Sequence, residues 1–434
     1  MTFGGVSMKT MRVGRVLLVA ILFVNLAAAG FSDVPAYDQS KYQFSLPVVL
    51  ERSVPRRADA DRGWIQKAID GRAAQGGGTV VVPPGVHNIG TIWLRSGVEL
   101  HLEKGAVLNG SARQEDYDQF PRKDCPITPE FSDKALICAA NAEDIAITGE
   151  GVIDGNGPAF YDTSKFVRGT SPFWRVPDLP RPRLVQFANC RRIRLSGVTF
   201  RDAAAFTMYV RGCEDFTVGH VAVVGDRRIT NNDGIHMDGC RRVRIGDSSV
   251  NTGDDCIVLR AIRTRTDPER PVVCEDVVVS NCTLSSACQA IRIGCPSDDT
   301  IRNVVFRDID MTGSRNGIYF GNHLYCVREA DEGFLDATDI LFENFRGVLT
   351  GRPIQILVDD GIKLRRIDRV TFRNVDVRGT GTRYWTTIRS PFGSVRYENV
   401  TINGKRQPDG QVPVSKVSDA PFVRAPALTW DNLN

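Results

Sequence analysis

Three aspartates stand in two short polar segments of the 434-residue chain. Asp233 lies in Asn231-Asn232-Asp233-Gly234, and Asp254 and Asp255 lie in Gly253-Asp254-Asp255-Cys256, 21 residues further on. Such carboxyl groups are suited to acid/base catalysis, because one can protonate a leaving oxygen while another attacks or activates water. Taken singly, each segment is also typical of a polar turn. Acid/base chemistry therefore requires a fold that brings the three carboxyl groups together.

The spacing of 21 residues is close to the length of one coil of a parallel β-helix. Successive coils of this fold stack about 4.8 Å apart, so residues one coil apart share one surface. Adjacent residues of a regular strand point to opposite faces, so Asp254 and Asp255 can reach the same groove only from a strand end. We expect a bend at Gly253 to allow this.

An internal repeat supports the coil interpretation. A small or cysteine residue, two polar residues and alternating aliphatic residues recur along the chain, which is typical of strands with one face inward. Loop insertions lengthen single coils without disturbing the stack. The clearest copies begin at Cys190, Cys213, Cys240 and Cys274, weaker copies begin at Ile301, Ala337 and Ile367, and an earlier copy at Ala142 lies 48 residues, or about two coils, before Cys190.

This repeat predicts an all-β fold, a parallel β-helix or solenoid. A β-sandwich needs regular hairpin turns and a propeller needs blades of about 40 residues, and neither predicts a repeat of single strand phrases. From Ala58 to Gln75 the sequence predicts a short amphipathic helix, with Ile65, Ala68 and Ile69 on one face. We expect this N-terminal helix to cap the open end of the first coil.

The first 29 residues are typical of an export signal. Lys9, Arg12 and Arg15 precede an apolar run over residues 16–24, which small residues follow. The run is shorter than the roughly 20 residues that a membrane-spanning helix needs. We therefore expect a secreted or periplasmic protein in which residues 1–29 are a signal peptide, residues 30–57 an N-terminal extension, residues 58–425 the β-helix domain and residues 426–434 a C-terminal tail.

Charge argues against two classes of partner. Removal of the signal takes away three cations and no acids, so the formal net charge falls from +4 to +1. A nearly balanced surface has no global field that attracts nucleic acid or a membrane. The sequence predicts a monomer that binds neither of them once the signal is removed.

The 11 cysteines are odd in number and scattered, so at least one thiol stays unpaired unless it bonds another chain. We expect the cysteines at the recurring phrase position to form an inward stack of small, reduced residues. Zinc is not expected, because no Cys-x-x-Cys pair occurs among Cys274, Cys282, Cys288 and Cys295, and the five histidines do not cluster with them. The sequence thus predicts no metal and no cofactor.

Because of the repeat and the aspartates, residues 58–405 resemble glycoside hydrolase family 28, the polygalacturonase family of right-handed parallel β-helix enzymes. The matching phrases follow the family's order, and the ordered set is more specific than any single phrase. They are Gly-Gly-Gly-Thr at 76–79, Gly-Val-Ile-Asp-Gly-Asn-Gly at 151–157, Arg-Pro-Arg-Leu-Val-Gln-Phe at 181–187, Asn-Asn-Asp-Gly-Ile at 231–235 in place of Asn-Thr-Asp-Gly-Ile, and Gly-Asp-Asp-Cys-Ile at 253–257.

Three departures from the family pattern concern the substrate. Gln289 replaces the family histidine within residues 288–294. The family's Arg-Ile-Lys, which grips the substrate carboxylate, aligns with residues 318–321, Ile-Tyr-Phe-Gly, and both cations are lost. His236 stands where the family has the last Asp of Asn-Thr-Asp-Gly-Ile-Asp. The resemblance keeps the hydrolytic aspartates and loses the galacturonate-binding residues.

The resemblance implies an inverting mechanism in which Asp254 is the general acid, and Asp233 and Asp255 hold and deprotonate the water. Crowding of three carboxyl groups raises the pKa of at least one of them. Four further candidates would bind substrate: Gln289 by hydrogen bonds to sugar hydroxyls, Arg292 as a replacement cation, His236 by a bond to substrate or to Asp233, and Tyr319 by stacking on a sugar. The last three are also compatible with a surface strand residue, a turn residue and a packing aromatic, respectively.

The sequence therefore predicts a secreted inverting glycoside hydrolase that acts on a polysaccharide, a pectin-type or related uronate- or rhamnose-containing glycan. Loss of the family cations predicts poor activity on plain polygalacturonate. Two alternatives stay open. A β-elimination lyase on the same fold usually needs calcium and a basic residue, whereas a non-catalytic polysaccharide-binding β-helix would retain the aspartates only as turns.

Overall fold

The computed structural model describes residues 47–48, 58–121, 133–167, 173–176, 180–263, 270–294, 296–322, 334–358, 364–379, 387–388 and 393–412. All of them belong to one compact unit, Ala36–Asn434. The predicted signal peptide (1–29) and C-terminal tail (426–434) lie outside the described residues, as does the predicted extension except for residues 47–48.

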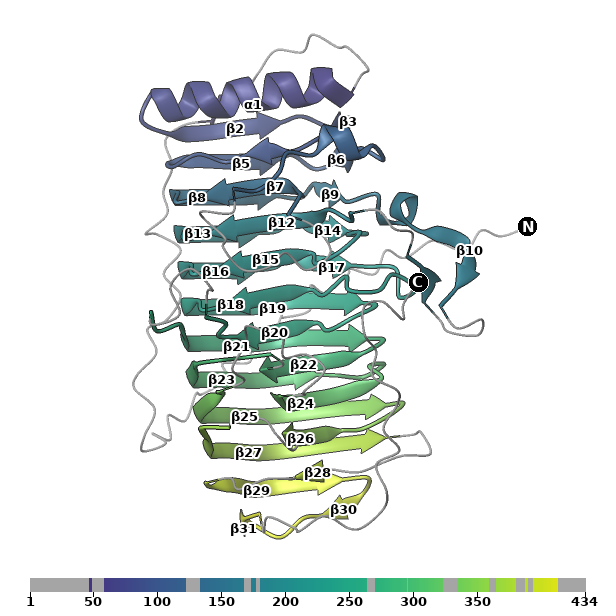
Figure 1. Ribbon diagram of the computed structural model, residues 1–434, viewed down its shortest axis with the longest axis vertical. Helices are drawn as coiled ribbons and strands as arrows, with labels where there is room; N and C mark the ends of the chain where they lie inside the picture. Colours follow the sequence, from purple (N-terminus) through teal and green to yellow (C-terminus); the bar gives the residue numbers. More distant parts are fainter. Residues whose placement is uncertain are drawn as a thin grey trace, which may run out of the picture. The chain divides into compact units, whose positions relative to one another are not determined.

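Two large sheets, built by stacking the strands of successive coils, form most of the described chain (Figure 1). The second sheet has ten strands, all paired in parallel. Its strands are β4 (Ile92–Trp93), β7 (Ala135–Ala140), β12 (Arg183–Ala188), β15 (Met208–Arg211), β18 (Ile235–Asp238), β20 (Ile257–Arg260), β22 (Gln289–Gly294), β24 (Asn316–Asn322), β26 (Ile354–Val358) and β28 (Thr387–Ile388).

The first sheet has 19 strands and carries two positions of each coil. Strands β16 and β17 of one coil both pair with the single long strand β19 of the next. Its strands are β1 (Pro47–Val48), β2 (Gly78–Val82), β3 (Gly85–Ile89), β5 (Val98–Leu102), β6 (Ala106–Gly110), β8 (Glu143–Gly149), β9 (Val152–Asp154), β13 (Arg191–Ser196), β14 (Thr199–Arg201), β16 (Glu214–Gly219), β17 (Ala222–Val224), β19 (Arg241–Thr252), β21 (Val273–Ser286), β23 (Thr300–Asp310), β25 (Asp336–Leu349), β27 (Arg366–Gly379), β29 (Val395–Ile402), and the antiparallel β30 (Lys405–Arg406) and β31 (Gly410–Gln411).

The core lies between the sheets, where equivalent residues of successive coils stack. One column of the second sheet pairs Ile235 with Ile257, then Ile291, Ile318 and Ile354. Each of these side chains is at most 1% exposed. Full burial of one such side chain stabilises the fold by about 1.5–3 kcal/mol. The inward aliphatic residues of the repeated phrases therefore favour the coil. The predicted parallel β-helix is confirmed.

The repeat phrases fall in register, with one exception to the predicted coil count. Arg191 pairs with Glu214 on one side and with Glu143 on the other. The copy at Ala142 is therefore one coil before Cys190, and the prediction of about two coils was wrong. The reason is an insertion between β9 and β12, which contains the 3-10 helix η3 (Gly157–Phe160) and the antiparallel pair β10 (Asp162–Phe166) and β11 (Trp174–Arg175).

The recurring cysteines line the core, as predicted. Cys190, Cys213, Cys240 and Cys274 are all 0% exposed. The backbone N–H of Cys190 donates to Cys213 Sγ at 3.4 Å across neighbouring coils. Every cysteine within the described residues is free. These side chains therefore act as small packing residues.

The predicted capping helix is present as α1 (Ala58–Ala74), which lies along β2 at the purple end of the strand stack in Figure 1. Ile65 and Ile69 are fully buried, and Ala68 packs against the same core. The only other short helix besides η3 among the described residues is the 3-10 turn η2 (Gln114–Asp116). Within the described part of the chain, no helix is long and apolar enough to cross a membrane.

Candidate active site

The three aspartates lie in the loops that enter two neighbouring strands of the second sheet. Asp233 precedes β18, and Asp254 and Asp255 lie between the end of β19 at Thr252 and the start of β20. The N–H of Gly234 donates to the carbonyl oxygen of Asp255 at 2.8 Å, which places the two segments on adjacent coils. The predicted one-coil separation thus corresponds to a direct backbone contact.

The chain bends at residues 253–254, so the Asp pair occupies a strand entrance and not a strand interior. A Cβ at Gly253 would stand 2.2 Å from the carbonyl oxygen of Ile229 and 2.8 Å from Asn232 Oδ1. The φ angle of Gly253 is not in the left-handed region that favours glycine. Glycine is needed at this bend because the backbone of the preceding coil approaches so closely.

Asp255 is completely buried and is held from both sides. Its Oδ2 accepts a hydrogen bond from Arg292 Nη1 at 2.6 Å, and its Oδ1 accepts one from the backbone N–H of Gln289 at 3.1 Å. The Arg292 side chain is 15% exposed. A charge-assisted pair of this kind keeps a buried carboxylate compensated and fixed in direction.

Asp233 is 4% exposed, and its Oδ2 lies 3.0 Å from His236 Nδ1. Burial, together with the charges of Asp254 and Asp255, raises the pKa of Asp233 well above its ordinary range. Burial also lowers the pKa of His236 well below its ordinary value, and Arg260 acts in the same direction. His236 is therefore neutral near pH 7, and its bond to Asp233 is a hydrogen bond between a neutral ring and the carboxyl group.

His236 points to an outer face of the second sheet that is packed. Its ring lies 4.5 Å from the ring of Phe206 and 5.4 Å from that of Tyr209. Phe206 and Tyr209 belong to an apolar cluster separate from the main core. His236 is fully buried there, and its Nε2 has no hydrogen-bond partner among the described residues.

Asp254 is the half-buried member of the three. Its Oδ2 accepts hydrogen bonds from the backbone N–H of Asn231 at 3.1 Å and from Asn231 Nδ2 at 3.4 Å. Its own N–H donates to Asn232 Oδ1 at 3.0 Å, while its Oδ1 accepts from the N–H of Asp255 at 3.0 Å. Asn231 therefore fixes the Asp254 carboxyl group of the next coil, and Asn232 fixes the Asp254 backbone.

Three of the predicted substrate-binding residues adjoin the aspartates directly: His236 contacts Asp233, and Arg292 and Gln289 contact Asp255. Gln289 is half-buried, and its Nε2 lies 3.6 Å from Cys288 Sγ. Tyr319 pairs with Arg292 in the next coil and is only 2% exposed. Its ring lies beneath the Arg292 guanidinium, 5.4 Å away, and packs with Leu357. Tyr319 was predicted to stack on a sugar, but Arg292 covers the face of its ring.

Sequence reasoning missed the supporting roles of Asn231 and Asn232. Both stand within a phrase that carries the family resemblance, and the place of that phrase in the chain was the available signal. Their contacts with Asp254 depend on side-chain directions in loops. No strand pattern predicts those directions.

The Asp254, Asp255 and Cys288 side chains are the one group of potential metal ligands found among the described residues, with ligand atoms within 4.8 Å of one another. Arg292 already bonds Asp255. Burial, together with the charges of Asp254 and Asp255, raises the pKa of the Cys288 thiol well above its usual value. A protonated thiol and an occupied carboxylate make a poor cation site.

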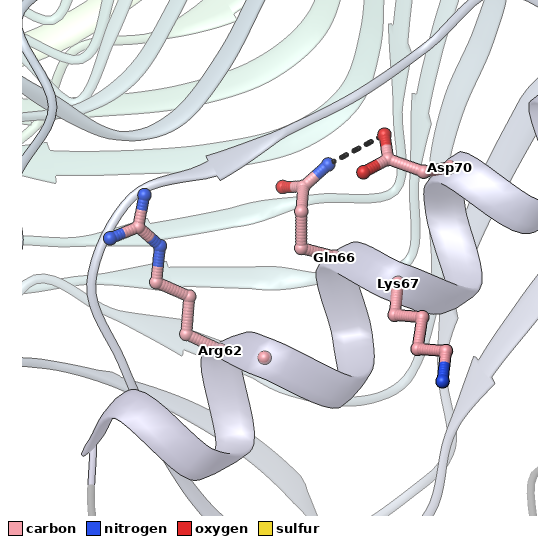
Figure 2. A pocket seen from close by; sticks show the side chains of 5 residues that line it. Arg62, Gln66, Lys67 and Asp70 are labelled. Carbon is pink, nitrogen blue, oxygen red and sulfur yellow. Dashed lines mark hydrogen bonds between the residues drawn. The ribbon is translucent and has the colours of Figure 1, made fainter.

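A shallow surface depression lies elsewhere, on α1. Figure 2 shows Arg62, Gln66, Lys67 and Asp70 along one side of this helix. Gln66 Nε2 donates to Asp70 Oδ1 at 3.1 Å, and Arg62 pairs with Asp118 at 2.6 Å. Gln66, Asp70 and Arg62 thus have polar partners, so the depression lacks the converging unpaired groups of an active site.

Comparison with known proteins shows the family and the fold of the chain. The sequence model of glycosyl hydrolases family 28 matches residues 124–267 and 263–401. The chain belongs to this family, as predicted.

Polygalacturonase QRT2 from Arabidopsis thaliana is 27% identical over 241 residues, which cover 50% of this chain and 53% of that protein. Exopolygalacturonase clone GBGE184 from the same plant is 26% identical over 261 residues, 55% of this chain and 60% of that protein. The chain spans about half to three fifths of the length of these curated relatives.

Solved structures show the fold. The polygalacturonase from Erwinia carotovora ssp. carotovora matches with a TM-score of 0.64 at 19% identity, over 86% of this chain and 96% of that one. An exopolygalacturonase from Thermotoga maritima matches with a TM-score of 0.61 at 19% identity, over 84% and 96% of the two chains. The fold class is a right-handed parallel β-helix, as predicted.

Proposed function

We propose that this chain hydrolyses glycosidic bonds of a pectin-type polysaccharide and inverts the configuration at the anomeric carbon. The observation that carries the proposal is the meeting of Asp233, Asp254 and Asp255 on adjacent coils, each with different partners. Membership of a glycosyl hydrolase family and similarity to polygalacturonases support the reaction class and the substrate class.

In this proposal Asp254 is the general acid. It is the half-buried carboxyl group of the three, so a glycosidic oxygen can approach it from solvent. Its proton passes to the leaving oxygen as the bond between that oxygen and the anomeric carbon breaks. Asn231 holds the carboxyl group in one direction during this step, and Asn232 holds the Asp254 backbone.

Asp233 and Asp255 hold the water and take its proton as its oxygen bonds the anomeric carbon. Arg292 keeps Asp255 compensated, and the raised pKa of Asp233 makes that group a stronger base once it is ionised. His236 holds Asp233 through Nδ1. Arg292 and His236 thus act on the substrate through the two aspartates.

The substrate is expected to be a rhamnose-containing or neutral glycan in preference to plain polygalacturonate. The two cations of the family's Arg-Ile-Lys are absent here, and the nearest replacement, Arg292, bonds Asp255. A cation that already compensates an internal carboxylate is a weak partner for a uronate carboxylate. Gln289 remains available for hydrogen bonds to sugar hydroxyls.

We also propose that residues 1–29 direct export to a secreted or periplasmic location, that residues 58–425 form the catalytic domain, and that the protein acts as a monomer. The basic start and the short apolar run of the first segment support export. The described helices and strands of the domain begin with α1 at Ala58 and end with β31 at Gln411.

A panel digest tests the proposed function. The parent protein is incubated with polygalacturonate, rhamnogalacturonan and neutral pectic side chains, and the products are identified by mass spectrometry and by proton NMR of the new reducing ends. Hydrolysis products whose anomeric configuration is inverted, released faster from rhamnogalacturonan or side chains, are expected. Fast cleavage of plain polygalacturonate would contradict the substrate preference.

The same digest separates the two alternatives. An unsaturated product that absorbs in the ultraviolet and disappears with a chelator identifies a lyase. Binding of the glycans without any product over a long incubation identifies a non-catalytic binding protein. Either result would overturn the proposed reaction.

A further inference from the structure

Arg181 is a buried cation that lies beside the candidate general acid without contacting it. It is 4% exposed and comes directly before β12, at the end of the insertion that lengthens this coil. Its Nη1 donates to the carbonyl oxygen of Thr230 at 3.0 Å and also to the hydroxyl of Tyr161. Its Nη2 donates to Asn231 Oδ1 at 3.1 Å.

The bond to Asn231 fixes the direction of the Asn231 amide. Because Oδ1 accepts from Arg181, Nδ2 is turned toward Asp254, to whose Oδ2 it donates. The backbone N–H of Asn231 donates to the same oxygen. Asn231 has a φ of +59°, a left-handed conformation that asparagine tolerates better than most residues.

Tyr161 links this arrangement to the insertion. Its hydroxyl hydrogen is shared between the carbonyl oxygens of Thr230 (2.8 Å) and Ala204 (2.9 Å), and its hydroxyl oxygen accepts the bond from Arg181. The Arg181 guanidinium lies 5.5 Å from the Tyr161 ring centroid. The planar fork of arginine bonds three residues at once, Tyr161, Thr230 and Asn231, which a lysine ammonium at the same place cannot do with the same geometry.

We propose that Arg181 is a positioning residue for catalysis: it holds the Asn231 amide so that Asn231 orients the carboxyl group of Asp254 toward the leaving oxygen. This inference rests on the proposed role of Asp254 as the general acid. Arg181, the first arginine of the Arg-Pro-Arg phrase, would thus act on Asp254 through two successive hydrogen bonds, from Arg181 to Asn231 and from Asn231 to Asp254.

Kinetics of Arg181→Gln and Arg181→Lys test the proposal, with the reducing-end assay on the pectic polysaccharide that the parent cleaves fastest. A misdirected acid lowers kcat on the order of 100-fold for Arg181→Gln, with KM little changed. Arg181→Lys is expected to recover part of the loss, because one donor to Asn231 or Thr230 can be kept. Arg201→Gln is the matched control. This variant loses a partly exposed ion pair with Asp154, and its activity is expected to equal that of the parent.

A double-mutant cycle with Asn231→Ala separates positioning from a general loss of folding. If Arg181 acts through Asn231, the double variant is no slower than Asn231→Ala alone. Independent, multiplying losses of kcat, or a kcat for Arg181→Gln within about twofold of the parent, would overturn the proposal.

A crystal structure of Arg181→Gln gives a second readout that does not depend on turnover. The Asn231 amide is expected to turn away so that Nδ2 no longer bonds Asp254, and an unchanged Asn231 to Asp254 contact contradicts the proposal. Asp254→Asn is assayed beside these variants. If Asp254→Asn keeps the parent rate, the proposed function fails; if only Arg181→Gln does, the positioning role alone fails.

Discussion

Arg292 Nη1 on β22 lies 2.6 Å from Oδ2 of Asp255, which enters the neighbouring strand β20. The Asp255 side chain is fully buried and that of Arg292 is 15% exposed, so solvent screens the pair little. This ion pair differs from more exposed pairs such as that between Arg302 and Glu275, because it holds a candidate catalytic group.

Removal of Arg292 is expected to destabilise the protein and to reduce activity. Arg292→Met leaves the buried Asp255 carboxylate without its cation, and loss of one partner of a buried pair costs about 3 kcal/mol of unfolding free energy. Urea unfolding measures the cost. Arg302→Gln, which breaks a surface pair with Glu275, is the control and is expected to change stability by less than about 0.5 kcal/mol.

Addition of Asp255→Asn to Arg292→Met should recover part of the lost stability, because no buried charge then remains unpaired. Additive losses in the double variant would mean that the two side chains do not stabilise each other.

The raised pKa of Asp233 predicts a definite pH dependence of stability. Burial and the charges of Asp254 and Asp255 keep a proton on Asp233 in the folded state at pH values where the unfolded chain has released it. Its contribution is fully present below pH ~4 and is lost as the pH rises through the folded pKa. The parent should therefore lose stability relative to Asp233→Asn as the pH rises above ~4, measured by urea unfolding.

Asp144→Asn provides a control of opposite sign. Hydrogen bonds from Arg192 lower the pKa of Asp144, so its contribution is present above the unfolded pKa and is lost as the pH falls through the folded value. If the stability difference between the parent and Asp233→Asn does not vary with pH, the assignment for Asp233 is incorrect. For activity, the proposed base role places the acidic limb of the kcat/KM profile above pH ~4.

Gly253→Ala is expected to damage both folding and catalysis. The added Cβ would meet the carbonyl oxygen of Ile229 at 2.2 Å, and the displacement needed would move the adjacent Asp254. Overpacking of this kind costs about 1–3 kcal/mol. Thermal unfolding and kcat of the variant measure the two effects.

Gly63→Ala on α1 is the matched control, because a Cβ there meets nothing within 4 Å. In a helix interior the change from glycine to alanine stabilises by about 0.5–1 kcal/mol. Equal behaviour of the two alanine variants would show that the close approach at Gly253 is not required.

The fold was largely predictable from the sequence because its determinants are local and repeated. The phrase that begins at Cys190 carries its inward residues at every second position, and the same phrase recurs in the coils on either side. The error in coil count before Cys190 has a simple origin. Residue spacing measures the length of chain between two strands, and it cannot distinguish a coil from an insertion that leaves the stack and returns.

The candidate site was predictable only in part. Asp233, Asp254 and Asp255 follow from strand spacing and from the family phrases, whereas the burial of His236 and Tyr319 does not. Outward residues of a strand are ordinarily exposed, but His236 lies against Phe206 and Tyr209 on a packed outer face. The pairing of Arg292 with Asp255 likewise depends on a loop carboxylate and a strand side chain of the next coil, whose directions no periodicity specifies.

In the proposed mechanism the three aspartates cleave a glycosidic bond, and Asp254 is the acid. The most direct test is the initial rate of reducing-end release by Asp254→Asn, compared with the parent on the same pectic polysaccharide at the same pH. Asparagine keeps the shape of the side chain and cannot donate the required proton. The rate of reducing-end release is therefore expected to fall by at least about 100-fold while the protein stays folded. A rate for Asp254→Asn equal to that of the parent would contradict the mechanism.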